Sequence, residues 1–125
     1  MRKQAQIQQQ QPQCINHKIN KQKMSKPIVL RLGDIRYAQA AWKKFGQEYD
    51  VIAIDSTSGY TREKFLKELQ DPASKLSKVS VITRTFPSVQ QTGLFDKELC
   101  DALPSSVKAI CHNGAGYDQI QVEHF

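Results

Sequence analysis

The sequence predicts an α/β fold in which a partial parallel sheet of flavodoxin-like topology, flanked by helices, follows a disordered tail. Short apolar runs of strand length alternate with stretches whose apolar residues recur at helical spacing, and the composition changes sharply at Met24. Such alternation is typical of parallel sheets that carry helices on both faces. With right-handed connections between the strands, we expect the flavodoxin-like strand order 2-1-3-4.

Residues 1–25 are expected to form the disordered tail, a Gln-rich basic extension. The first 23 residues hold eight Gln, five Lys or Arg and no acid, so they carry most of the formal charge of +6. The residues from Met24 onward hold the other 13 bases against 12 acids and are nearly neutral. A segment this polar buries too little apolar surface to offset its ordering entropy. The alternatives are a targeting peptide and an upstream extension ahead of a start at Met24.

The first half of residues 26–125 predicts two strands and two helices. Ile28–Leu32 and Val51–Ile54 are short apolar runs of strand length. The helix between them has five apolar positions at helical spacing and a glycine placed to end it: Ile35, Ala38, Ala41, Trp42, Phe45 and Gly46. Thr61 can cap a second helix, which Asp71-Pro72 ends. The apolar face of that helix consists of Phe65, Leu66 and Leu69.

The second half predicts two further strands around one more helix. Val79–Thr83 is the third strand, and a loop over Arg84–Gly93 follows it. Asp96 can cap a helix that packs through Leu99, Cys100 and Leu103. Val107–Cys111 is the fourth strand. The chain then turns through residues 113–116.

The composition argues against several functional classes. Three Cys without a C-x-x-C pair indicate neither a disulfide framework nor a zinc site, so we expect no metal and a reducing compartment. No apolar run approaches the roughly 18 residues of a membrane span. Because the folded part is nearly neutral, we expect no nucleic-acid or membrane partner. A nucleic-acid binder acting through the basic tail is an alternative, although that tail lacks aromatic stacking platforms.

Glycines stand where the fourth strand ends, at the edge of the sheet where parallel α/β proteins bind ligands. In Gly114-Ala115-Gly116 the lack of bulky side chains lets main-chain N–H groups approach an anion such as a carboxylate. The alternative is a tight turn that needs positive φ. A dinucleotide fingerprint would need glycine where Gln119 stands, so no coenzyme is expected to bind these residues.

Three further residues lie near the same edge. Arg84 follows the third strand and is a candidate for facing an anionic ligand, the alternative being a solvated or ion-paired side chain. His112 ends the fourth strand, where a structural histidine is the simpler interpretation. Cys111 is expected to be a small core residue.

The segment Ile110–Ile120, which reads ICHNGAGYDQI, resembles a signature of the D-isomer-specific 2-hydroxyacid dehydrogenases. The matching positions are Gly114, Gly116, Asp118 and Ile120. Thr83-Arg84-Thr85 and Phe95–Pro104 resemble the loop and the helix that precede this signature in the family. The resemblance covers about residues 26 to 125 and is closest to the glyoxylate and hydroxyisocaproate reductases. It departs from the family at Gln121, where an aspartate is usual.

The resemblance implies the amino-terminal part of a substrate-binding domain in an oxidoreductase that reduces 2-keto acids, such as glyoxylate, to D-2-hydroxy acids. Main-chain groups of Ala115 and Gly116, with Gly114, would hold the substrate carboxylate, and Arg84, Thr85 and Phe86 would form the cleft wall.

NAD or NADP serves the intact family, but the coenzyme-binding domain and the family's catalytic arginine, glutamate and histidine would lie outside this chain. No catalytic residue is therefore assigned, and the chain alone is expected to be inactive. The resemblance also implies a cytoplasmic protein, with a mitochondrial location as the alternative, and a homodimer for the intact enzyme. A non-catalytic flavodoxin-like binding or regulatory module is the alternative function.

Overall fold

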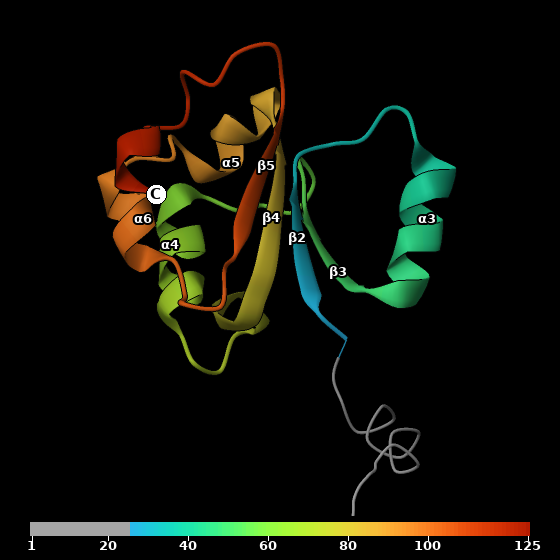
Figure 1. The fold of residues 1–125 in the computed structure, drawn as a ribbon, viewed down its shortest axis with the longest axis horizontal. Helices are drawn as coiled ribbons and strands as arrows, with labels where there is room; N and C mark the ends of the chain where they lie inside the picture. Colours follow the sequence, from blue (N-terminus) through green and yellow to red (C-terminus); the bar gives the residue numbers. More distant parts are fainter. Residues whose placement is uncertain (1–25) are drawn as a thin grey trace, which may run out of the picture.

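The computed structural model describes residues 26–125, which form one parallel sheet with helices on both sides (Figure 1). The predicted tail, residues 1–25, lies outside the described residues. The strands are β2 (Ile28–Leu32), β3 (Asp50–Ile54), β4 (Val79–Thr85) and β5 (Ala109–Asn113), and they lie in the order β3-β2-β4-β5. All three pairings are parallel. Counted along the chain this is the order 2-1-3-4, so the predicted topology is confirmed.

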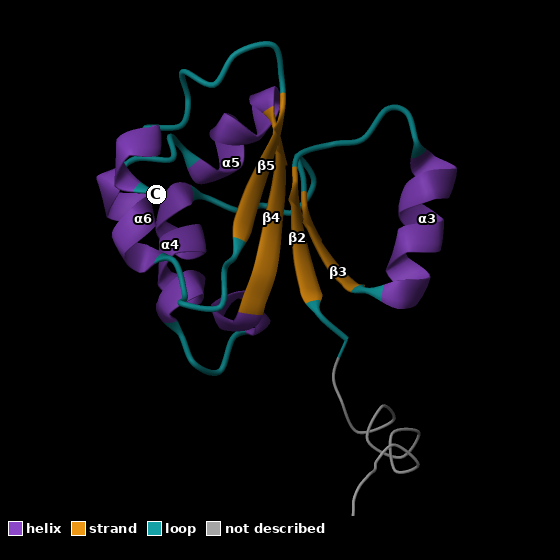
Figure 2. Ribbon diagram, in the orientation of Figure 1, coloured by secondary structure: helices purple, strands orange, loops and turns teal. Residues whose placement is uncertain are grey.

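Helices connect the strands, and Figure 2 shows one of them standing apart from the rest. The α-helices are α3 (Gln39–Glu48), α4 (Arg62–Gln70), α5 (Val89–Thr92) and α6 (Lys97–Ala102). Three short 3-10 turns are η2 (Lys75–Lys78), η3 (Phe86–Ser88) and η4 (Val122–His124). Helix α3 lies on one side of the sheet, and α4, α5 and α6 lie on the other (Figure 1). No described helix is long and apolar enough to cross a membrane.

The core lies between the sheet and the side that carries α4 and α6. Alternate residues of the strands face it, and they meet the apolar faces of the two helices. The fully buried members include Leu30, Leu32, Ile54, Phe65, Leu69, Ile82, Phe95 and Leu99. Each buried side chain of this size contributes about 1.5–3 kcal/mol to folding. The caps predicted at Thr61 and Asp96 are present, since their side chains accept hydrogen bonds from the N–H groups of Lys64 and Leu99.

Helix α3 differs from its prediction. It runs past Gly46 to Glu48, ends at the extended residue Tyr49, and buries none of its residues. Its start is also unusual, because Ala38 has a φ of 61° and provides no side-chain cap. The apolar spacing predicted the presence of the helix, but Ile35 and Ala38 lie before its first residue, and spacing alone does not show how much neighbouring surface exists to cover it. The helix packs beside β3, and the sheet beyond it stays open.

The strand ends also differ from their predictions. Strand β4 continues two residues further, through Arg84 and Thr85, and β5 is shifted toward the glycines. Their ladder pairs Thr85 with Asn113, so the pairing continues as far as the glycine loop. The predicted loop over 84–93 is mostly ordered as η3 and α5. Cys111 is exposed on the open face rather than buried in the core.

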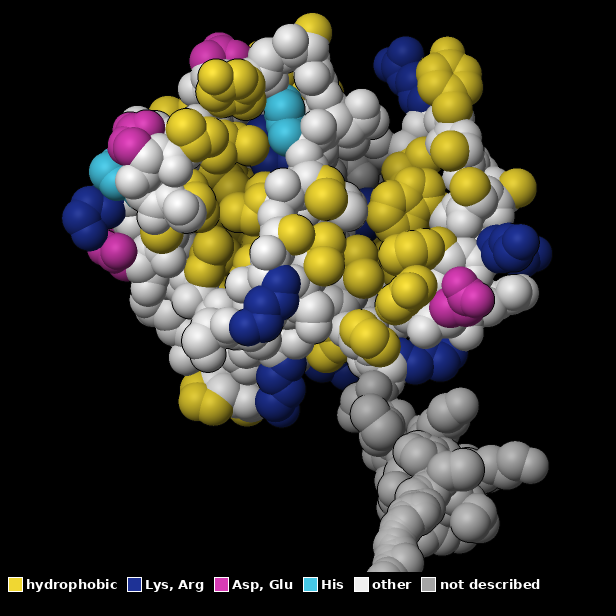
Figure 3. Space-filling model, in the orientation of Figure 1, with side chains coloured by type: hydrophobic (Ala, Val, Ile, Leu, Met, Phe, Trp, Pro, Cys, Tyr) yellow, Lys and Arg dark blue, Asp and Glu magenta, His cyan; other side chains and the backbone are white. Residues whose placement is uncertain are grey.

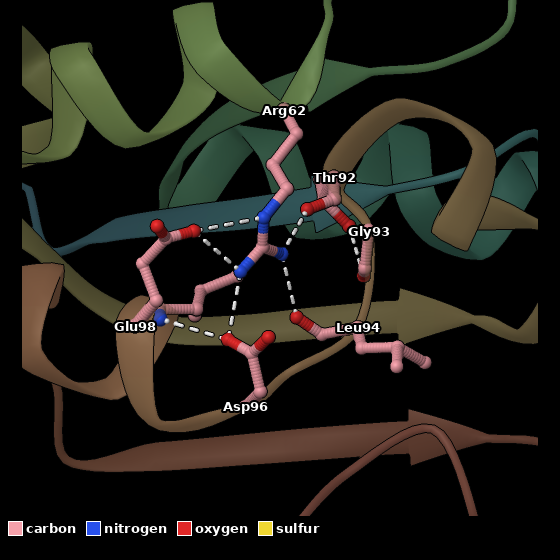
Figure 4. A network of polar contacts seen from close by, with 7 residues as sticks. Arg62, Thr92, Gly93, Leu94, Asp96 and Glu98 are labelled. Atoms are coloured by element: carbon pink, nitrogen blue, oxygen red, sulfur yellow. Dashed lines mark hydrogen bonds and ion pairs between the residues drawn. The ribbon is translucent and has the colours of Figure 1, made fainter.

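Arg62 ties helix α4 to the segment between α5 and α6 (Figure 4). Its guanidinium donates to Asp96 Oδ1 at 2.7 Å, to Glu98 Oε2 at 2.9 Å and to the carbonyl oxygens of Thr92 and Leu94 at 2.9 and 2.7 Å. Gly93 has a φ of 74°, and a Cβ there would lie 2.7 Å from Arg62 Nη1. The turn therefore passes this close to the arginine only as glycine.

Replacing Arg62 tests how much this network stabilises the fold. We expect Arg62→Met to lower the free energy of unfolding by about 2 kcal/mol, because several hydrogen bonds to a charged group are lost together. Lys67→Met on the same helix is the control, since Lys67 is exposed, and it should change stability by less than about 0.5 kcal/mol. Urea denaturation measures both. Equal effects of the two substitutions would contradict the role of the network.

Asp96 makes the stability depend on pH. Burial opposes its ionisation, but the hydrogen bonds from Leu99 N–H and Arg62 outweigh that effect and hold the pKa of its carboxyl below the ordinary value of 3.8. A lowered folded-state pKa stabilises the protein above the unfolded pKa, and the stabilisation is lost as the pH falls through the folded value. Asp96→Asn keeps a cap oxygen but not the charge. We expect its stability deficit, measured by urea denaturation, to be constant above pH 5 and to shrink below about pH 4.

Candidate functional site

The two segments that the sequence singled out lie side by side at the carboxyl ends of β4 and β5. In the ladder, Arg84 is the partner of His112, and Thr85 is the partner of Asn113. The glycines follow directly after Asn113, so the loop 113–118 begins beside the end of β4. Parallel sheets bind ligands at this edge, because the loops that leave the strands surround a crevice there.

The loop itself is exposed, and its main chain is available to a ligand. Residues 113–118 are all exposed. Within residues 26–125, no acceptor takes a hydrogen bond from the main-chain N–H of Ala115 or Gly116. Neither loop glycine has positive φ, unlike Gly33, Gly59 and Gly93. The alternative of a tight turn that requires positive φ is therefore wrong.

Gly114 is needed for a different reason, which is close packing. A Cβ at this position would lie 2.6 Å from His112 Nε2. Real Cβ atoms do not approach a neighbouring atom this closely, so any other residue would push the loop or the imidazole away. At Gly116 the nearest atom to an added Cβ is Asp118 Oδ1 at 3.3 Å, which a small shift relieves.

Arg84 is enclosed by protein groups beneath the loop. Its exposed fraction is 1%. Nη1 lies 2.9 Å from His112 Nδ1, Nη2 donates to Gln119 Oε1 at 2.8 Å, and the guanidinium lies over the Phe95 ring at 4.9 Å. Among the described residues it forms no ion pair, and burial lowers the pKa of the guanidinium. The alternative of a solvated or ion-paired arginine is therefore wrong, and the side chain faces the core layer rather than open solvent.

His112 has a defined tautomer in this arrangement. Because a guanidinium only donates, Nδ1 must accept, and the ring hydrogen of a neutral imidazole then lies on Nε2. Nε2 is buried and has no hydrogen-bond partner among the residues that the structure describes. The structural role expected of this histidine is thus met at only one of its two ring nitrogens. One nitrogen is fixed by Arg84, and the other faces Gly114.

The chain after the loop is held by the same arginine. Gln119, which accepts from Arg84, is buried, and its main-chain oxygen accepts from Phe95 N–H at 2.9 Å. Gln121 N–H in turn donates to the carbonyl oxygen of Phe95 at 2.8 Å. From the sequence, Gln119 was notable only as the residue that stands where a dinucleotide fingerprint would need glycine. The only feature of the sequence that could have marked Gln119 is a polar side chain next to the apolar Ile120. A polar residue in that position is ordinarily expected at the surface and not in the core.

A hollow of about 760 Å³ opens beside these strand ends on the α3 side. Arg31, Thr83, Thr85 and Asn113 line it from the sheet, and Trp42 lines it from α3, with the Arg31 guanidinium 5.5 Å from the Trp42 ring centre. The glycines do not line it, but Asn113 brings it to the foot of the loop. Figure 3 shows hydrophobic side chains gathered over the strands beside α3. Phe86, 47% exposed, follows Thr85 directly.

The described residues include no cluster of His, Cys, Asp or Glu that could hold a metal ion. A dinucleotide fingerprint would need a third glycine where Gln119 stands, and after the loop the chain forms the 3-10 turn Val122–His124. What this edge presents is an exposed loop in which the main-chain N–H groups of Ala115 and Gly116 have no acceptor among the described residues.

Comparisons with known proteins give a consistent result. No family model matches the chain. It is 57% identical over 100 residues to glyoxylate reductase 1 of Saccharomyces cerevisiae, a match that covers 80% of this chain and 28% of that protein. It is 37% identical over 97 residues to 4-methyl-2-oxopentanoate reductase A of Aspergillus oryzae, covering 78% and 28% of the two chains. The crystal structure of a glyoxylate reductase from Paecilomyes thermophila superimposes with a TM-score of 0.70 at 40% identity, covering 81% and 29%.

The matches cover 78–81% of this chain, and the chain spans less than a third of the length of these relatives. All three are reductases by name, two of them of glyoxylate. The chain is similar to these relatives both in sequence and in fold. The chain therefore belongs to the D-isomer-specific 2-hydroxyacid dehydrogenase family.

Proposed function

We propose that residues 26–125 are part of the substrate-binding domain of an NAD(P)-dependent reductase of 2-keto acids, and that the glycine loop binds the substrate carboxylate. The observation that carries the proposal is the pair of free main-chain N–H groups at Ala115 and Gly116, on an exposed loop at the carboxyl edge of the sheet. Fixed N–H dipoles favour a carboxylate without a charged side chain. Relatives named for glyoxylate and for 4-methyl-2-oxopentanoate, both 2-keto acids, support this ligand class.

The neighbouring segment forms the wall of the proposed cleft. Thr85 lies beside Asn113 in the sheet, and the exposed ring of Phe86 comes next, so an apolar surface adjoins the carboxylate position. Arg84 supports this wall from the core side. A 2-keto acid presents a carboxylate to the amides and its remaining carbon atoms to the ring. The described residues provide binding and orientation, and the family resemblance implies that the coenzyme site and the proton donor lie outside residues 26–125.

Direct binding of a keto acid tests the loop. In NMR titrations of the ¹⁵N-labelled chain with glyoxylate, we expect the largest shifts at the amides of Ala115 and Gly116. Gly114→Ala should weaken binding by about tenfold or more, because the added methyl displaces His112 or the loop.

Gly46→Ala is the matched control for this titration. An added Cβ at Gly46 meets nothing within 4 Å, and the site lies in helix α3. This variant should bind glyoxylate as the unaltered chain does. Shifts that centre on another part of the sheet, or normal binding by Gly114→Ala, would show that the loop does not hold the carboxylate.

Turnover is a separate test. We expect the purified chain, mixed with glyoxylate and NADH or NADPH, to leave the absorbance at 340 nm unchanged, since Gln119 stands where a dinucleotide fingerprint would need glycine. The intact yeast relative, assayed in parallel, is the positive control. Coenzyme oxidation by this chain alone would overturn the proposed division of roles.

A binding module is the second candidate, and one observation favours it. Strand β5 pairs only with β4 among the described strands, and an apolar hollow of about 530 Å³ lies along it, lined in part by Leu103, Ile110 and Ile120. An unpaired strand edge beside apolar surface is a site for association. Mixing the chain with an intact dehydrogenase and following co-elution separates the two functions. A monomer that binds glyoxylate supports the first, and a stable complex without glyoxylate binding supports the second.

A further inference from the structure

We propose that Arg84 is a positioning residue that holds the glycine loop from the core side in the arrangement that binds an anion. The inference rests on the proposed function and deepens it, because it names the side chain that gives the loop amides their geometry. Its two Nη atoms reach the two ends of the loop. Nη1 meets His112, just before the loop, and Nη2 meets Gln119, just after it.

Stability alone does not account for an arginine here. The guanidinium is 1% exposed and forms no ion pair among residues 26–125. Removing a charge from water is costly, and apolar replacements of buried charged groups are often neutral or stabilising. The contact with the Phe95 ring returns only part of that cost. What an apolar side chain would lack is the planar pair of donors that sets the positions of two acceptors at once.

His112 carries the effect of Arg84 to the glycines. Because Nη1 lies against Nδ1, the ring is held as the tautomer with hydrogen on Nε2. That nitrogen is buried beside Gly114, with a hypothetical Cβ only 2.6 Å away. The ring edge therefore lies directly under the first glycine and limits the positions that the loop can take. Gln119 fixes the other end through Phe95, whose N–H donates to its carbonyl oxygen.

The same arrangement also sets the sign of the charge that the loop favours. A guanidinium without a carboxylate partner and an imidazole N–H that faces the loop both raise the local electrostatic potential. In a buried setting these contributions are weakly screened. An anion at the amides of Ala115 and Gly116 would offset them without touching Arg84.

The tautomer of His112 tests the inference without any ligand. Long-range ¹H–¹⁵N spectra of the full chain report which imidazole nitrogen carries hydrogen. Near pH 8 we expect one tautomer with hydrogen on Nε2, and a mixture in Arg84→Met. A ring with hydrogen on Nδ1 in the unaltered chain would overturn the inference, whether or not the chain binds a keto acid.

Ligand binding provides the second test. Arg84→Met should weaken glyoxylate binding about tenfold, and Arg84→Lys, which lacks the planar fork, should weaken it by a smaller factor. Lys78→Met also removes one positive charge. It lies exposed just before the other end of β4, so it controls for net charge and should bind normally. Normal binding by both Arg84 variants would overturn the inference and leave the proposed function intact.

Gln119→Leu covers the case in which Arg84→Met does not fold. It removes one of the two contacts and keeps the guanidinium. We expect faster amide hydrogen exchange over residues 115–118 and several-fold weaker glyoxylate binding, with His112 still in the Nε2–H form. Unchanged exchange and binding in this variant would count against Arg84 as the support of the loop. If the unaltered chain binds no glyoxylate, the proposed function fails, and the tautomer still decides the contact between Arg84 and His112.

Discussion

The guanidinium of Arg84 lies where the sheet, the core and the glycine loop meet. It belongs to β4, stacks on Phe95 of the core, and contacts His112 and Gln119 on either side of the loop. Only two acceptors meet this buried charge, His112 Nδ1 and Gln119 Oε1, and its Nε has no partner among the described residues, so each of the two contacts matters. The positions of His112 and Gln119 are therefore constrained together, and the exposed amides between them inherit that constraint. The exposed glycine loop thus lies on two buried polar side chains, Arg84 and Gln119.

The two faces of the sheet are covered to different extents, and the loop is supported from the better-covered face. The face toward α4 and α6 holds the buried core, and Arg62 fastens the α5–α6 segment against it. The opposite face is covered beside β3 by α3, which buries none of its own residues. The hollow near Asn113 lies on this more open side. The hollow and the buried support of the loop thus lie on different faces of the same two strand ends.

The fold class and strand order were predictable because they depend on local apolar patterns and on general rules of parallel sheets. Caps at Thr61 and Asp96 were equally readable, since a side chain bonds to an N–H three residues away. The end of β4 was not, because its last two residues are ordered by pairing with β5 and not by their own apolar character. The exposure of Cys111 and of α3 depends on how much chain packs over one face, which no local pattern records.

The candidate site was likewise predictable from the sequence only in part. The glycines could be found as a motif, and their place after a strand indicated anion binding. The environment of Arg84 could not, because its partners are 28 and 35 residues away along the chain. A strand-end arginine is ordinarily expected in solvent or in an ion pair, whereas the partners of Arg84 are a histidine and a glutamine. Gly114 looked like a turn residue, whereas its requirement comes from His112 packed beneath it.

A crystal structure of the chain grown with glyoxylate tests the central claim most directly. The account predicts the carboxylate oxygens within hydrogen-bond distance, roughly 3 Å, of the main-chain nitrogens of Ala115 and Gly116, with Arg84 still enclosed beneath them. Glyoxylate bound elsewhere, with those two nitrogens turned away from it, would contradict the account.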